Sequence, residues 1–161
     1  MKIAIVASEG APYCKSGGLG DVMKALPEAL SHIEGNEVLL ILPYYKRIKE
    51  NPKFVTELVA QFTVQLGWRR QYCGIEMIEQ DGVKWYFMDN KFYFGRPYIY
   101  GMGGDEYERF GFFCRASLNF LPIIGFQPDV IHAHDWQSGM VPALLKIQYA
   151  HLPFFAGIKT M

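Results

Sequence analysis

The chain has 161 residues, of which 50% are hydrophobic and 16% aromatic, a length and composition that fit one compact domain with its own core. Sixteen Lys and Arg residues balance sixteen Asp and Glu residues, so the formal net charge is zero. This balance excludes the broad electrostatic attraction that drives binding to nucleic acids or to anionic membranes. We therefore expect no nucleic-acid partner, and any recognition of phosphate has to be local.

The amino terminus and the cysteines indicate a protein of the reducing cytoplasm. The apolar run 3–7 is too short for the core of a signal peptide, and no run in the sequence approaches a membrane span. Cys14, Cys73 and Cys114 are odd in number, lie far apart and form no C-x-x-C pair, so neither a disulfide framework nor a zinc site is indicated. We expect a cytoplasmic protein with reduced thiols, no membrane association and no metal.

A glycine-rich turn between a strand and a helix organises the start of the chain. Residues 3–7 are apolar at every position, which is typical of an interior strand in a parallel sheet. Apolar residues recur at the spacing of one helical face from Val22 to Ile33, which predicts a helix over 18–33 with a bend at Pro27. Between the strand and the helix lies the sequence Lys-Ser-Gly-Gly-Leu-Gly-Asp-Val.

This turn has the chemistry of a phosphate site. Gly17 and Gly18 let backbone amides approach an anion closely, and the free N–H groups at the start of the helix favour negative charge. Lys15 adds a full positive charge at the rim. The spacing matches neither G-x-G-x-x-G nor the Walker loop, so a simple tight turn between strand and helix remains an alternative.

The next segments predict a parallel strand followed by an antiparallel excursion. Residues 37–43 form a second buried strand, which a right-handed β-α-β crossover places parallel to the first. A polar loop or short helix over 44–56 follows. Apolar and polar residues then alternate over 61–66, and the segments 72–79 and 83–88 flank an Asp-Gly turn. We therefore expect antiparallel strands inserted into or appended to the parallel sheet.

An aromatic and glycine-rich loop separates this excursion from the next helix. Residues 92–104 have no periodicity, and their rings suit either stacking on sugars or filling the edge of a core. Asp105 is placed to cap the helix that follows, with Glu108 completing a capping-box pattern, and this helix is expected to end at Pro122. For Arg109 a surface ion pair is the expected state, with a ligand contact as the alternative.

Two histidines lie at the end of a further buried strand. The strand over 129–133 brings His132 and His134 to its carboxyl end, the edge at which open α/β sheets bind ligands. The two side chains share a face of the strand, and Asp135 can orient one imidazole by hydrogen bonding. A metal site would require a third ligand that the neighbouring sequence does not supply. A substrate-facing histidine, favoured by its position, and histidines buried against backbone carbonyls remain.

The last segments complete the predicted fold. The apolar spacing over 138–149 predicts a helix, and residues 152–155 predict the start of another strand. The whole pattern predicts a Rossmann-like α/β fold, with a mostly parallel sheet, helices on both faces and an antiparallel β excursion.

Two of these segments resemble the signatures of one enzyme family. The glycine turn that begins at Lys15 is similar to a motif of bacterial glycogen synthases and plant starch synthases. The string His-Ala-His-Asp-Trp, from His132 to Trp136, matches a second motif of that family residue for residue. The aromatic loop between them also resembles the family, except that Glu106 stands where the family usually has Asn. The resemblance therefore extends over the whole chain.

The resemblance implies a fold and an activity. The fold would be GT-B, with two Rossmann-like domains around a cleft. Residues 1–161 would be the amino-terminal, acceptor-side domain, incomplete at its carboxyl end and without the nucleotide-sugar domain. The activity would be retaining transfer of glucose from ADP-glucose, the donor substrate, to the non-reducing end of an α-1,4-glucan such as glycogen, with no cofactor and no metal. The fragment alone would be inactive.

The family motifs also imply roles for residues on the donor side. Lys15 and the amides of Gly17 and Gly18 would bind the donor phosphate. Asp21 would contact sugar hydroxyls or hold the loop, and its position in the first turn of a helix is also explained by the helix dipole alone.

His134 would be the catalytic residue, facing the glucosyl unit so that its ring or carbonyl stabilises the developing cation, and Tyr100 would contact the acceptor glucan. Two other function classes stay open: a non-catalytic nucleotide- or glucan-binding module, and a nicotinamide-dependent oxidoreductase. The oxidoreductase is disfavoured because Leu42, Pro43 and Tyr44 stand where an acidic residue would bind the ribose.

Overall fold

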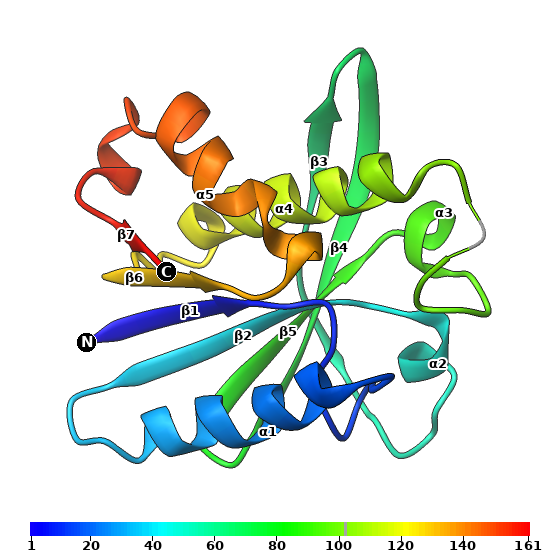
Figure 1. Ribbon diagram of the computed structural model, residues 1–161, viewed down its shortest axis with the longest axis horizontal. Coiled ribbons are helices and arrows are strands. Elements are labelled where there is room, and N and C mark those ends of the chain that lie inside the picture. The colour runs from blue at the N-terminus through cyan, green and yellow to red at the C-terminus, as the bar shows by residue number, and fades with distance from the viewer. Residues whose placement is uncertain (102) are drawn as a thin grey trace.

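The computed structural model describes residues 1–101 and 103–161 (Figure 1). Its strands are β1 (Lys2–Val6), β2 (Glu37–Pro43), β3 (Glu57–Leu66), β4 (Arg69–Gln80), β5 (Val83–Asp89), β6 (Val130–Ala133) and β7 (Lys159–Thr160). Its α-helices are α1 (Gly18–Ser31), α2 (Lys46–Lys49), α3 (Lys91–Phe94), α4 (Glu106–Ile123) and α5 (Met140–Leu144). The strands form one sheet in the order β3-β4-β5-β2-β1-β6-β7, which confirms the predicted α/β class.

The parallel part of the sheet is built around β1. This strand pairs in parallel with β2 on one side and with β6 on the other, so Val6 lies opposite both Ile41 and Ala133. β5 pairs in parallel with β2, and β7 pairs in parallel with β6. The run 3–7 is almost fully buried because both faces of the sheet are covered, which explains why each of its residues is apolar.

The antiparallel excursion consists of β3 and β4. β4 pairs antiparallel with both β3 and β5, and the predicted Asp-Gly turn joins β4 to β5. β5 then returns to the parallel sheet beside β2, so it belongs to both parts. α4 packs against β3, and the tip of the hairpin of β3 and β4 projects beyond the helices (Figure 1).

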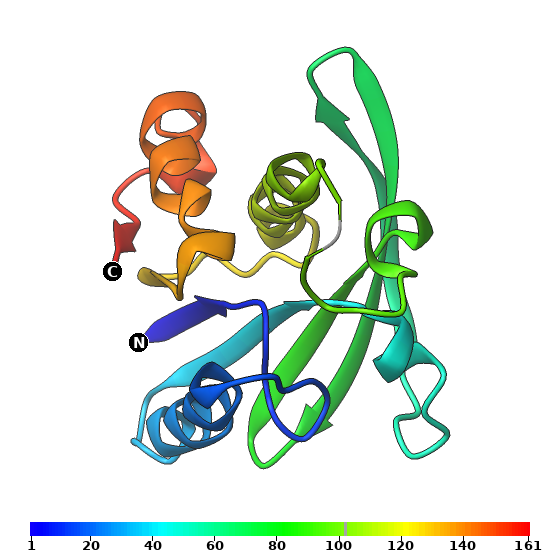
Figure 2. The same ribbon diagram turned by 45° about the vertical axis from the view of Figure 1, so that its right-hand side comes forward.

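Helices cover both faces of the sheet, as predicted. α1 packs on one face against β2 and β5, whereas α4 and α5 lie on the opposite face (Figure 2). Met23 and Pro27 form part of the buried side of α1. Phe112, Phe113 and Phe120 of α4 are fully buried, so aromatic rings fill much of the core on that face.

α1 continues through Pro27, which is buried and cannot donate a hydrogen bond within the helix. Two later segments differ from the expectations. The segment expected as one helix over 138–149 is divided into a 3-10 turn over 136–138, α5, and a π turn over 145–149. Residues 153–155 form a 3-10 turn rather than a strand, because Pro153 occupies its first position, where a missing N–H costs nothing.

The expected loop 92–104 begins with the short helix α3. Asn90 caps this helix, since its side-chain oxygen accepts a hydrogen bond from the amide of Tyr93 at 3.0 Å. The hydroxyl of Tyr93 donates to Glu108 at 2.6 Å, so Glu108 fixes α3 to α4. Residue 102 of this loop lies outside the described part of the chain.

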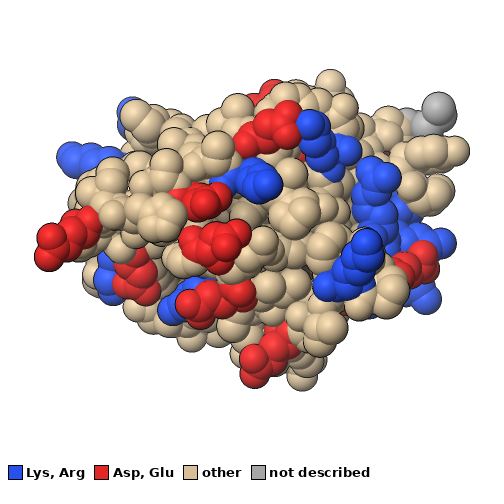
Figure 3. Space-filling view, turned by 90° about the horizontal axis from the view of Figure 1, so that it is seen from below, with Lys and Arg blue, Asp and Glu red and all other residues tan. Residues whose placement is uncertain are grey.

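Charged side chains of both signs share the surface. Acidic and basic groups are interspersed over the face seen in Figure 3, and basic groups gather at its right-hand end, on the side of α2 and α3. The distribution agrees with the zero net charge. No helix in the described part of the chain has both the length and the apolar character that a membrane span requires.

The substitution Phe112→Ala should lower the free energy of unfolding by about 3–5 kcal/mol, because the surrounding core cannot fully close the cavity left by the buried ring. Tyr107→Ala changes a ring on the same helix that is 85% exposed, and should shift that free energy by no more than about 0.5 kcal/mol. Urea unfolding of the 161-residue chain measures both. Equal losses for the two variants would contradict this packing of α4.

Candidate functional site

Three loops meet at the carboxyl edge of the parallel strands. The loop after β1 carries the glycine turn, and the segment after β6 carries His134. The amide of His134 donates to the carbonyl of Val6 at 2.9 Å, and this hydrogen bond links the two loops where they leave β1 and β6. The third loop, 95–105, reaches the first through Tyr100, whose hydroxyl lies 2.7 Å from Oγ of Ser8. The segments singled out in the sequence thus lie at the edge where open α/β sheets bind ligands.

Packing explains the glycine at one position of the turn but not at the other two. Gly17 precedes α1 with an extended φ of −147°, and a Cβ added at Gly17 or Gly18 would meet nothing within 4 Å. A Cβ at Gly20 would lie 2.8 Å from Cγ of Lys15, so this glycine makes room for the lysine side chain. The packing of the described chain therefore requires glycine at Gly20 and leaves open space over Gly17 and Gly18.

Lys15 and Asp21 form an ion pair across the turn. Nζ of Lys15 lies 2.7 and 2.6 Å from the two carboxylate oxygens of Asp21, and both side chains are about half exposed. Asp21 also lies in the first turn of α1, where its negative charge is favoured by the helix dipole. The pair holds the lysine beside the glycine turn.

Glu9 is the residue of this site that sequence reasoning missed. It is 4% exposed, and its carboxylate accepts hydrogen bonds from the amides of Ser16 and Gly17 and from the hydroxyls of Ser16 and Tyr100. Burial opposes the charged form, yet these hydrogen bonds outweigh it and hold the pKa of Glu9 below its ordinary value. The amide of Gly17, for which the sequence predicts a phosphate contact, thus donates to Glu9 in this structure. A lone acid after a strand gives no signal of such a role.

Aromatic contacts link Tyr100 to the histidine segment. The ring centroids of Tyr100 and Phe110 lie 6.1 Å apart, and Phe110 packs edge-on against Trp136 at 5.2 Å. Trp136 is 53% exposed and Tyr98, in the same loop as Tyr100, is 65% exposed. Trp136 in the histidine segment and Tyr98 in the loop of Tyr100 therefore both expose apolar ring surface of the kind that stacks on sugars.

Two expectations about the start of α4 are wrong. Asp105 makes no side-chain cap, because its carboxylate binds Arg96, with Oδ1 2.8 Å from Nη1. Arg109 is fully buried rather than at the surface, where it pairs with Glu106 at 2.8 Å and donates to the carbonyl of Tyr93 at 2.8 Å. Because a buried charge must be paired, Glu106 serves here as the counter-ion of Arg109.

The two histidines lie ring against ring at the end of β6. The ring centroids of His132 and His134 are 3.9 Å apart, which confirms that the side chains share a face. Burial, with a smaller contribution from His132, lowers the pKa of His134 to about 4, so this imidazole is neutral at pH 7. Its Nε2 atom is buried and has no hydrogen-bond partner among the described residues. A buried polar atom in this state is unusual, and a ligand atom would satisfy it.

Asp135 orients the backbone after His134 rather than an imidazole. Its φ of 65° is uncommon for a residue other than glycine, and its side chain accepts a hydrogen bond from the amide of Trp136 at 2.7 Å. The carbonyl of His134 in turn accepts from Oγ of Ser138 at 2.6 Å. These contacts fix the turn that follows β6 and hence the place of His134.

The cysteines are buried thiols. Cys14, Cys73 and Cys114 form no disulfide, and burial raises the pKa of Cys14 and of Cys114 to about 12. Cys14 is therefore protonated at neutral pH in spite of its place beside the glycine turn. Within residues 1–101 and 103–161 there is also no group of three His, Cys, Asp or Glu side chains that could hold a metal ion.

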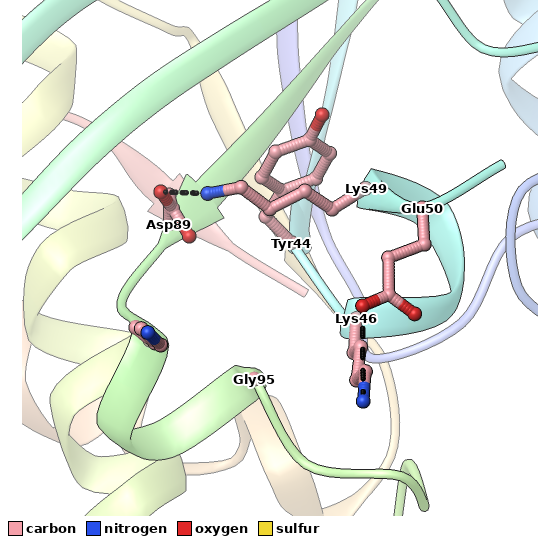
Figure 4. A pocket seen from close by; sticks show the side chains of 7 residues that line it. Tyr44, Lys46, Lys49, Glu50, Asp89 and Gly95 are labelled. Carbon is pink, nitrogen blue, oxygen red and sulfur yellow. Dashed lines mark hydrogen bonds and ion pairs between the residues drawn. The ribbon is translucent and has the colours of Figure 1, made fainter. Parts of the chain in front are cut away.

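A separate hollow of about 460 Å³ lies between α2 and α3 (Figure 4). It is lined by Tyr44, Lys46, Lys49, Glu50, Asp89, Lys91 and Gly95. Two of its lysines are paired with acids, Lys49 with Asp89 at 2.8 Å and Lys46 with Glu50 at 3.7 Å. Its lining includes neither the glycine turn nor the histidine segment, so we place the candidate site at the edge where those two segments meet.

Comparison with known proteins shows the family to which the chain belongs. A model described as "Starch synthase catalytic domain" matches residues 2–161. The chain belongs to the starch synthase catalytic domain family. The resemblance noted in the glycine turn and the histidine segment is thereby confirmed.

Named members of the starch synthase family are similar to this chain along its whole length. "Glycogen synthase" of Geobacillus thermodenitrificans (strain NG80-2) is 50% identical over 161 residues, which are 100% of this chain and 33% of that protein. "Glycogen synthase" of Bacillus subtilis (strain 168) is 46% identical with the same coverage. The chain thus spans about a third of the length of these relatives.

A solved structure of the family is also similar. It is described as the "Catalytic domain of Starch Synthase IV from Arabidopsis thaliana bound to ADP and acarbose" and superposes with a TM-score of 0.79 at 28% sequence identity. The match covers 99% of this chain and 32% of that chain. The mostly parallel sheet with helices on both faces is therefore the fold of a starch synthase domain.

In this family member the imidazole of His134 should remain neutral until the pH falls to about 4. The unfolded chain binds that proton near pH 6.5, so stability from the neutral ring is fully present above about pH 6.5 and is lost as the pH falls toward 4. Histidine NMR titration measures the pKa, and urea unfolding at pH 7 and pH 5 measures the loss. His134→Gln should lose less stability between these two pH values than the wild type. A pKa near 6.5 in the folded chain would contradict the burial of this ring.

Proposed function

We propose that the full-length protein is a glycogen synthase that transfers glucose from ADP-glucose to the non-reducing end of an α-1,4-glucan, with retention at the anomeric carbon. Relatives at 50% and 46% identity carry the name glycogen synthase, and the solved relative holds ADP and acarbose. The observation that carries the proposal is the open glycine turn at the start of α1. Packing within the chain does not require glycine at Gly17 or Gly18, because an added Cβ would meet no atom there.

The turn supplies donors for the diphosphate of ADP-glucose. Gly18 is the first residue of the 14-residue helix α1, and N–H groups in a first helical turn have no intrahelical acceptor and carry partial positive charge. The open space over the glycines lets a phosphate oxygen approach these amides. Lys15 adds a full charge, and its exposed side chain is free to turn from Asp21 toward phosphate.

The main chemical difficulty of the transfer is charge. As the bond to the diphosphate breaks, negative charge accumulates on phosphate and positive charge on the sugar ring, and preorganised groups must meet both. The amides of the turn and Lys15 face the negative charge. His134 faces the sugar, where a neutral imidazole avoids the repulsion that an imidazolium would add, and its unpartnered Nε2 is available for a hydrogen bond.

Asp21 and Tyr100 complete the proposed contacts. When Lys15 turns to phosphate, the carboxylate of Asp21 is released to accept hydrogen bonds from sugar hydroxyls. The buried ring of Phe110 lies between Tyr100 and the exposed Trp136, and we place the acceptor glucan over Trp136 and the aromatic loop that carries Tyr100.

This chain supplies one part of the proposed catalytic cleft. We take it as the acceptor-side domain of a GT-B enzyme whose second domain provides further groups that neutralise the diphosphate. The 161-residue chain by itself should then transfer no glucose. Three buried thiols without a disulfide agree with the cytoplasm as the place of this activity.

The full-length protein should incorporate glucose into glycogen from ADP-glucose faster than from UDP-glucose. Lys15→Ala and His134→Ala should each lower kcat/KM by about 10²-fold or more, because each removes a group positioned for charge that develops in the transition state. Lys24→Ala, which removes an exposed lysine from α1 outside the turn, is the control and should keep the wild-type rate. A protein that binds glucan but uses neither nucleotide sugar would instead be a glucan-binding module.

The substitution Gly18→Ala separates ligand approach from packing. The added methyl group meets no atom of the chain, so the free energy of unfolding should stay unchanged or rise by up to about 1 kcal/mol. The methyl group occupies open space beside Gly18 that the proposal assigns to phosphate, so the KM for ADP-glucose should rise about tenfold or more.

The matched control is Gly35→Ala, at a remote turn where φ is +80°. An alanine there is strained, so this variant should lose stability and keep the wild-type KM. A Gly18→Ala enzyme with the wild-type KM for ADP-glucose would remove the glycine turn from the donor site.

A further inference from the structure

We propose that Glu9 is a positioning residue whose buried carboxylate fixes the glycine turn and the aromatic loop in one arrangement, and that this arrangement sets the place of the donor diphosphate. The inference rests on the glucosyl transfer proposed above. It deepens that function, since Glu9 faces the chain itself and acts on substrate through the groups that it holds.

The carboxylate of Glu9 is saturated by donors from two loops. Oε2 accepts from the amides of Ser16 and Gly17, the latter at 3.1 Å. Oε1 accepts from the hydroxyls of Ser16 and Tyr100, each at 2.7 Å. A carboxylate offers about four lone-pair sites, so these four donors use its full capacity. Successive backbone amides that converge on one anionic oxygen form the kind of concavity that binds phosphate in other proteins, and here the chain fills it with its own acid.

This occupation determines which amides remain for a ligand. Because Ser16 and Gly17 donate to Glu9, the first amides over open space are those that begin at Gly18. Without the carboxylate, the amides of Ser16 and Gly17 would also be available to phosphate, and the diphosphate would have a second position along the turn. Glu9 thereby restricts the donor to one position at the start of α1.

The same carboxylate connects the donor turn to the acceptor side. Tyr100 lies 91 residues from Glu9 in the sequence, and its hydroxyl is the link between their loops. Burial, together with the nearby Glu9, raises the pKa of Tyr100 well above its ordinary value, so the hydroxyl keeps the proton that it donates. The ring of Tyr100 is held against Phe110 and, through it, beside Trp136. A displacement of Glu9 would therefore be transmitted to both substrates.

Variants of the full-length enzyme test this role through the two Michaelis constants. Glu9→Ala removes the acceptor that holds the amides of Ser16 and Gly17 in place, so the glycine turn loses its fixed arrangement and the KM for ADP-glucose should rise about ten- to hundredfold. Glu9→Gln should be much milder, because its oxygen can still accept from the two amides while its nitrogen donates to the hydroxyls. Tyr100→Phe removes the hydroxyl that links the aromatic loop to Glu9 and Ser8 and keeps the two amide bonds of Glu9, so it should raise the KM for glucan and leave the KM for ADP-glucose nearly unchanged. Rescue by glutamine would show that geometry, not charge alone, is what Glu9 supplies.

Hydrogen exchange gives a readout that does not depend on activity. In the full-length protein without ligand, Glu9→Ala should speed amide exchange in peptides that cover 15–18 and 98–101 and leave the strands β1 and β2 unchanged. Glu34→Ala, which removes an exposed acid just after α1, is the control and should alter neither loop. Mass spectrometry of the digested protein measures both.

The outcomes separate this inference from the proposed function. A folded Glu9→Ala enzyme with wild-type exchange in both loops and a wild-type KM for ADP-glucose overturns the positioning role. If Glu9→Ala does not fold, Tyr100→Phe decides, and wild-type amide exchange over 98–101 together with a wild-type KM for glucan overturns the positioning role. If the wild type transfers no glucose but Glu9→Ala still speeds exchange in both loops, the positioning role stands and the glycogen synthase proposal fails.

Discussion

The parallel pairing of β1 with β6 is the constraint on which the site depends. Because the two strands run in the same direction, both end at the same edge of the sheet, and the bond from the His134 amide to the Val6 carbonyl extends the pairing beyond β6. Burial on both faces keeps residues 3–7 apolar, so polar chemistry is concentrated at the carboxyl end of β6 and in the loops that leave this edge. The glycine turn and the histidine segment are therefore neighbours although most of the chain lies between them.

What has a local signal could be predicted from the sequence. The uniformly apolar run 3–7, the Asp-Gly turn and the alternation of the two histidines each depend on residues a few positions apart, and the family motifs marked loops that the fold brings to one edge of the sheet. What depends on distant partners could not be predicted. Glu9 resembles any polar residue that ends a strand, and Arg109 resembles any arginine on a helix surface. Their roles follow from Tyr100 and from Glu106, which the fold brings to them.

Buried charge holds the aromatic loop at two points. Arg109 and Glu106 are paired where the loop joins α4, and Glu9 holds the hydroxyl of Tyr100 in the middle of the loop. Removing one partner of such a contact leaves the other buried without compensation, which is far more costly than the contact is favourable. Tyr100 and the junction with α4 are therefore held in place before any ligand arrives, and binding does not have to supply the entropy of fixing these two points.

The contact between Lys15 and Asp21 affects how long an anion stays bound to Lys15. An anion that takes this lysine replaces a carboxylate that already neutralised it, so the attraction gained is only the difference between two exposed ion pairs, each typically worth about 1 kcal/mol or less. Departure is favoured in the same way, because Asp21 recaptures the lysine as the anion leaves. Such an exchangeable counter-ion keeps the residence time of a bound anion short, as the proposed transfer requires of its donor site.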